Sequence, residues 1–88
     1  MITLPEVDKE FLLDLNEKYA ISTVMVDINS DVFSQELIDK VASDGEEMEA
    51  YYNHLHLMEL WAELEYEASK HGPFRILISD GQVITEKI

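Results

Sequence analysis

The chain has 88 residues, 47% of them hydrophobic, and its 19 acidic residues against six Lys and Arg give a net charge of −13. This is the length of one domain, covering residues 1–88, and the apolar content excludes a chain disordered by composition. The absence of cysteine excludes disulfides, thiolate metal sites and cysteine nucleophiles. No apolar run approaches the roughly 20 residues that span a bilayer, and no signal peptide is visible, so we expect a soluble, cytoplasmic protein.

The first predicted element is a helix that begins after Thr3 and ends near Lys18. Thr3 with Glu6 three residues later has the spacing of a capping box, and Pro5 suits a first helical turn. One apolar face follows at three- and four-residue spacing, formed by Leu4, Val7, Phe11, Leu12 and Leu15.

Residues 21–28 predict a strand because they are rich in β-branched side chains. Alternation places Val24, Val26 and Ile28 on one side and Thr23, Met25 and Asp27 on the other. The turn and N-cap residues 29–31 are expected to start a short helix. Its shared face holds Phe33, Leu37, Ile38 and Val41, and Asp44-Gly45 ends it.

The dominant predicted element is a helix over residues 46–71, ended by Gly72 and Pro73. A hairpin follows, because Asp80-Gly81 lies between two alternating apolar segments. A two-residue loop sets Ile78 opposite Val83, Ile76 opposite Thr85, and Arg75 opposite Glu86. The predicted fold is therefore a two-layer α+β domain in the order α-β-α-α-β-β. A small three-stranded sheet with the C-terminal hairpin packs on the long acidic helix.

The long helix carries two apolar arcs when it is projected at about 100° per residue. One holds Ala50, His54, Leu57, Trp61, Leu64 and Ala68, and the other holds Met48, Tyr51, Leu55, Met58, Ala62 and Tyr66. Together they are wider than the single stripe that a surface helix needs. We expect the helix either to be sandwiched within the monomer, the favoured alternative, or to lend one side to a partner, including a second copy.

Eight acids and no Lys or Arg lie between Val41 and Ser69, seven of the acids on the helix and one, Asp44, just before it. Like charges such as Glu59 and Glu63 at i,i+4 destabilise the helix locally. A repeated pattern that lowers helix stability indicates that these acids have another function, which we expect to be binding. The predicted partner-binding residues are Asp44, Glu46, Glu47, Glu49, Glu59, Glu63, Glu65 and Glu67. Tyr51, Tyr52 and Trp61 are candidate apolar contacts, although core packing is the simpler interpretation of the aromatic residues. If these acids imitate the phosphates of a nucleic acid, the long helix alone could imitate one strand. Acids of the first helix would have to lie alongside the long helix to imitate both strands of a duplex.

Motifs for catalysis or metal binding are weak. Residues 27–31 match the start of an EF-hand loop, but Val32 and Ile38 replace its Gly and Glu. His54 and His56 lie on different helix faces, and His56 with Glu59 and Glu63 is a poor ligand set. No nucleophile elbow or Gly-rich loop is present, so we expect no enzyme, no metal and no cofactor.

In size, charge and lack of cysteine, the chain resembles the small acidic inhibitors made by phages and mobile elements. These include nucleic-acid mimics that block restriction enzymes, CRISPR effectors or repair nucleases, and acidic immunity proteins are similar. The resemblance lies in composition and implies an inhibitor that occupies the nucleic-acid-binding surface of a basic protein. Alternatives are an immunity protein or antitoxin for a basic nuclease, and a phage or housekeeping interaction module with incidental acidity. The charge is expected to repel nucleic acid and anionic membranes themselves.

Overall fold

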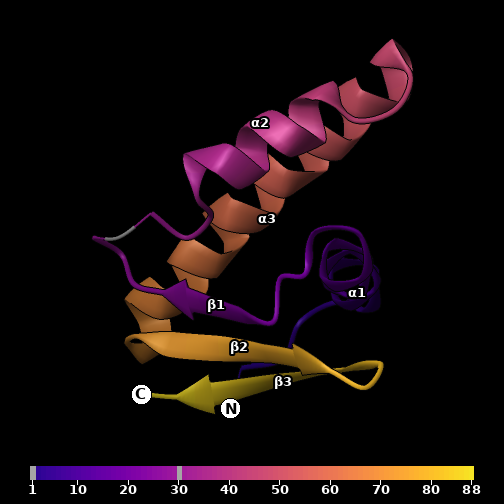
Figure 1. Cartoon of the computed structure of the whole chain (residues 1–88). Helices are drawn as coiled ribbons and strands as arrows, with labels where there is room; N and C mark the ends of the chain where they lie inside the picture. The colour runs from indigo at the N-terminus through magenta and orange to yellow at the C-terminus, as the bar shows by residue number, and fades with distance from the viewer. Residues whose placement is uncertain (1, 30) are drawn as a thin grey trace.

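A computed structural model describes residues 2–29 and 31–88, and within them it contains three α-helices and one three-stranded sheet (Figure 1). The order α-β-α-α-β-β and the α+β class are those predicted. The elements are α1 (Glu6–Tyr19), β1 (Thr23–Val26), α2 (Gln35–Ser43), α3 (Glu47–His71), β2 (Phe74–Ser79) and β3 (Gln82–Lys87).

The sheet is antiparallel, with β2 between β1 and β3. The predicted hairpin register is confirmed, with the partners Ile78 and Val83, Ile76 and Thr85, and Arg75 and Glu86. Asp80 and Gly81 both have positive φ, 52° and 72°, as a type I′ turn requires. The Arg75 Nε donates a hydrogen bond to Glu86 Oε1 at 2.9 Å, so the predicted ion pair forms.

The core lies between one face of the sheet and the helices. Alternation along β2 buries Phe74, Ile76 and Ile78 on this face. From the helices the largest fully buried side chains are Leu12, Leu15, Leu57, Leu60 and Leu64. The helix α2 packs along α3, and the two lie side by side above β1 in Figure 1.

The start of α1 differs from the prediction. The N-cap position is Pro5, whose carbonyl accepts from the backbone N–H groups of Asp8 and Lys9, and Thr3 makes no capping bond. Val7 is exposed, at 59%, while Asp8 is buried, at 4%. Asp8 shares the buried face of α1 with the residues three, four and seven positions later, Phe11, Leu12 and Leu15.

The strand β1 is shorter than expected, and α2 begins later. Ile28 lies beyond the strand end and is 51% exposed, so its predicted place beside Val24 and Val26 is wrong. The N-cap of α2 is Ser34, whose Oγ accepts from Leu37 N–H at 3.2 Å, and not a residue of the turn at 29–31. Ser30 of that turn lies outside the described residues.

Candidate protein-binding surface

The two predicted apolar arcs of α3 have different environments. The core-facing side buries Ala50, Leu57, Leu60, Leu64 and Ala68. The opposite side is exposed, and its large hydrophobic residues are between 41% and 67% accessible. We call this second arc the outer stripe: Met48, Tyr51, Leu55, Met58, Ala62 and Tyr66. The favoured interpretation, a helix sandwiched within the monomer, is wrong because neither the sheet nor α2 covers this arc.

Carboxylates border the outer stripe on both sides. Projection at about 100° per residue places Glu59, Glu63 and Glu67 along one margin, in steps of four residues. Glu47 and Glu65 share a line along the other margin. The acids of α3 therefore form two rows around an apolar strip, and not a single continuous arc.

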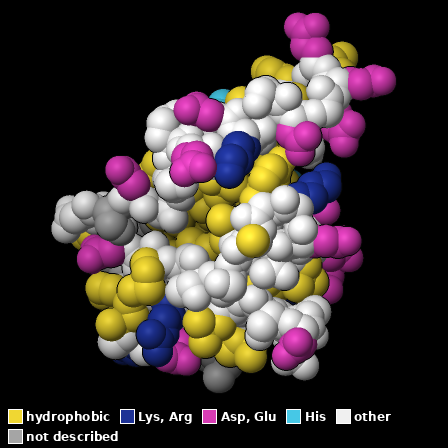
Figure 2. Space-filling model, viewed as in Figure 1, with side chains coloured by type: hydrophobic (Ala, Val, Ile, Leu, Met, Phe, Trp, Pro, Cys, Tyr) yellow, Lys and Arg dark blue, Asp and Glu magenta, His cyan; other side chains and the backbone are white. Residues whose placement is uncertain are grey.

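A further group of acids surrounds the turn between α2 and α3. Asp44, Glu46, Glu47 and Glu49 are all exposed there, and Figure 2 shows acidic side chains crowded around this end of the molecule. Asp44 is held within the monomer, because the Tyr19 hydroxyl donates to its Oδ2 at 2.6 Å. Burial, followed by this bond and the charge of Asp44, raises the pKa of Tyr19 to about 12. Tyr19 thereby fastens the end of α1 to this acidic turn.

Glu63 belongs to a small cluster with Asp8 and His56. His56 Nε2 lies 3.3 Å from Asp8 Oδ1, and the imidazole stacks on Phe11 with ring centroids 4.1 Å apart. Asp8 Oδ2 is buried and has no hydrogen-bond donor among the described groups. A hydrogen bond with Asp8, then burial and the charges of Asp8 and Glu67, raise the pKa of Glu63, while His56 acts to lower it. A protonated carboxyl can donate a hydrogen bond to Asp8 whereas a carboxylate cannot, which is why the neighbouring Asp8 raises the pKa of Glu63.

An open cavity of about 400 Å³ lies over this cluster, lined by Pro5, Val7, Asp8, His56, Glu59 and Glu63. Within residues 2–29 and 31–88, no group of three or more His, Asp or Glu side chains is arranged to hold a metal ion. Asp8 was not predicted to lie on the buried face of α1, although its spacing from Phe11, Leu12 and Leu15 was a visible signal.

The three predicted apolar contact residues do not lie together. Tyr51 and Tyr52 are each 59% exposed, and their rings meet edge-on with centroids 5.6 Å apart. Trp61 is only partly exposed and packs edge-on against buried Phe33 at 6.3 Å. Its indole N–H is buried without an acceptor among the described groups. Trp61 thus lies at the margin of the core, and only the two tyrosines face outward.

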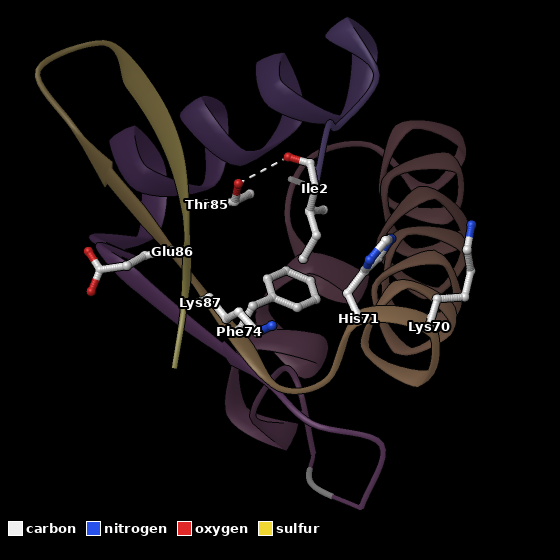
Figure 3. A pocket seen from close by; sticks show the side chains of 7 residues that line it. All are labelled: Ile2, Lys70, His71, Phe74, Thr85, Glu86 and Lys87. Atoms are coloured by element: carbon white, nitrogen blue, oxygen red, sulfur yellow. Dashed lines mark hydrogen bonds between the residues drawn. The ribbon is translucent and has the colours of Figure 1, made fainter.

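Another cavity, of about 470 Å³, lies between the end of α3 and the sheet (Figure 3). Ile2 and Phe74 point toward one another across it, whereas Lys70 and Glu86 point away. Thr85 Oγ1 donates to the Ile2 carbonyl at 3.1 Å, which ties the N-terminal segment to β3. The side chains of Lys70 and Glu86 do not converge on a common point in this cavity, so they form no charged binding site there. We interpret it as a gap between apolar side chains.

Comparison with known proteins assigns no family: no family model, curated protein or solved structure matches the chain. In the described part of the chain, no helix is both long and apolar enough to cross a membrane.

Proposed function

We propose that the protein is a small acidic inhibitor that binds a basic protein through the outward side of α3. The observation that carries the proposal is the outer stripe between its two rows of carboxylates. Binding interfaces have an apolar centre rich in aromatic residues and Met, with a polar rim. Tyr51, Leu55 and Met58 supply such a centre, at three- and four-residue spacing along one helix, and the glutamates supply the rim.

The chemistry of the partner follows from the charge of the rim. A chain of −13 attracts basic surfaces and repels nucleic acid, so the partner is a protein rich in Lys and Arg. Nucleic-acid-binding proteins and nucleases carry such surfaces to contact phosphates. Occupation of that surface by α3 would exclude the nucleic acid, which is the inhibitory mechanism that we propose.

Imitation of a nucleic acid charge by charge has less support. The row of Glu59, Glu63 and Glu67 has one carboxylate per about 6 Å of helix, whereas one nucleic-acid strand has a phosphate per roughly 3.4 Å. A second row from α1 is missing because α1 crosses α3 (Figure 1), and its Asp8 is buried at the crossing. We therefore propose apolar docking with a charged rim, in competition with nucleic acid.

The test begins with affinity capture of the partner from the source cell. Calorimetry with the purified partner then compares NaCl at about 50 and 300 mM, where we expect binding to weaken with salt, because charge attraction contributes to it. Excess DNA or RNA that the partner binds is expected to displace the protein. The double variant Leu55→Ser/Met58→Ser is expected to bind at least tenfold more weakly.

The matched control is Met25→Ser/Ile84→Ser, which changes residues of similar exposure on the sheet, 50% and 51% against 42% and 41%. We expect this control to bind the partner as the wild type does. Wild-type affinity in the α3 variant would contradict the docking proposal. If DNA or RNA fails to displace the protein from its partner, the inhibitory mechanism is contradicted. The proposal of the docking surface would still stand.

A further inference from the structure

The face of the sheet that points away from the helices is covered by no element of the described chain. Alternation in the paired strands puts two cross-strand rows on it: Thr23, Leu77 and Ile84 in one, and Met25, Arg75 and Glu86 in the other. Met25 is 50% and Ile84 51% exposed, and Leu77 between them is partly exposed. An apolar diagonal therefore crosses all three strands.

This open face is nearly neutral in a strongly acidic protein. The strands contain only three charged residues, Arg75, Glu86 and Lys87, and the first two form an ion pair. Figure 2 shows hydrophobic side chains with basic and a few acidic ones over the sheet, at the end of the molecule away from the acid-rich turn. The remainder of the surface carries the acids that make the net charge −13.

Charge decides which molecule this face can accept. A basic partner is attracted to the acid rows of α3 and not to a neutral face. A second copy, which also carries −13, is repelled wherever acids face acids, as they would across two outer stripes. The sheet is the apolar surface on which two copies approach with the least repulsion.

We propose that the open face of the sheet is a self-association surface, on which a second copy of this chain packs face to face. With a two-fold axis parallel to β2, Leu77 faces Leu77, Met25 of each copy lies diagonally beside Ile84 of the other, and the Arg75–Glu86 ion pairs of the two copies lie side by side. Such an isologous contact leaves both outer stripes free. The surface is small, so the dimer is a weak one that forms at high protein concentration. This proposal is independent of the proposed inhibitory function.

Sedimentation velocity over about 5 to 500 μM protein tests it without any partner. We expect reversible dimerisation that strengthens between about 50 and 500 mM NaCl, because salt screens the repulsion between two acidic molecules. Met25→Ser/Ile84→Ser should weaken dimerisation at least tenfold, whereas Leu55→Ser/Met58→Ser should leave it unchanged. Circular dichroism of each variant checks that the fold is retained.

A protein that stays monomeric at the highest concentration and in both salts would overturn the proposal. So would dimerisation that Leu55→Ser/Met58→Ser abolishes and Met25→Ser/Ile84→Ser does not, because the interface would then be the outer stripe. Dimerisation that weakens as salt is added would also overturn it, since attraction between charges would be the cause. None of these outcomes depends on whether a basic partner binds α3.

Discussion

Glu63 of α3 and Asp8 of α1 bring two carboxyl groups together where the helices cross. Two carboxylates cannot both ionise there without cost, because Asp8 is only 4% exposed. The contact therefore favours the protonated form of Glu63, whose pKa is raised by the neighbouring Asp8 and by burial. The charge of Glu63 on α3 therefore affects how stably the buried Asp8 of α1 packs against that helix.

The first prediction is a fall in stability with rising pH that depends on Glu63. Its pKa in the folded protein is above the ordinary value of 4.5, so the folded state binds more protons than the unfolded state above that pH. The free energy of unfolding should therefore decrease as pH rises from about 4.5 through the raised pKa. In Glu63→Gln we expect this decrease to be smaller and the melting temperature at pH 7 to be higher.

Glu65→Gln is the control, because it removes the same charge from the other margin of the outer stripe. Thermal unfolding of the three proteins at intervals between pH 4 and 8 measures the effect. Identical pH profiles for the wild type and Glu63→Gln would show that the Asp8–Glu63 contact has no energetic consequence. His56 faces the same carboxyls, so the profiles should also be compared in the His56→Gln background.

The second prediction concerns the two capping sites. Ser34→Ala should lower the free energy of unfolding by about 1 kcal/mol, because Leu37 N–H loses its acceptor. Thr3→Ala should change it by less than about 0.5 kcal/mol, because Thr3 caps no helix. Urea denaturation measures both, and a larger loss in Thr3→Ala would support the capping box predicted from sequence.

The third prediction separates the two sides of α3 with a matched pair of leucines. Leu57 is fully buried, so Leu57→Ala should cost about 2–5 kcal/mol of stability. Leu55 is 42% exposed on the outer stripe, so Leu55→Ala should change stability by less than about 1 kcal/mol. Equal losses in urea denaturation would mean that the outer stripe is buried in solution, for example in a dimer through α3.

Most of the fold could be predicted from the sequence because its signals are local. The type I′ turn at Asp80-Gly81 fixes the register of the hairpin, and Gly72 with Pro73 fixes the end of α3. Both depend on backbone conformations that few residues adopt. The predicted N-caps at Thr3 and at residues 29–31 were wrong, because several neighbouring residues could have started each helix. In the folded protein Pro5 and Ser34 occupy the N-cap positions instead.

The candidate surface was less predictable because it depends on tertiary contacts. The two apolar arcs of α3 look alike in sequence, and only the position of the sheet decides that Leu57 is inside and Leu55 outside. Trp61 was offered as a contact residue, but its ring packs against Phe33 from a distant segment. The pairing of Asp8 with Glu63 depends on the crossing of two helices, which no local pattern specifies.

The fourth prediction is that moderate salt stabilises the protein. A net charge of −13 on 88 residues repels itself, and added ions screen this repulsion. We expect the melting temperature to rise between about 20 and 300 mM NaCl at pH 7. Replacing NaCl with an equal concentration of sucrose controls for effects other than screening. A melting temperature that falls with NaCl would count against repulsion among the acids.

The last prediction tests the acid rows in partner binding. The structure favours Glu59 and Glu65 for charge reversal, one from each margin, because Glu63 contacts Asp8, and Glu67 Oε2 lies 3.5 Å from His71 Nε2. In Glu59→Lys/Glu65→Lys we expect at least tenfold weaker binding to the captured partner, about 1.4 kcal/mol, with a smaller dependence on salt. The fold should be retained, because the substitution also relieves the repulsion between Glu59 and Glu63.

The control is Glu10→Lys/Glu17→Lys, which changes the net charge equally at exposed positions of α1. If attraction came only from the total charge, both double variants would lose affinity to the same extent. A loss confined to the α3 variant would assign the charge contribution to the margins of the outer stripe. Equal losses would contradict this, because they would mean that the partner responds to the overall field of the protein and does not contact the two rows.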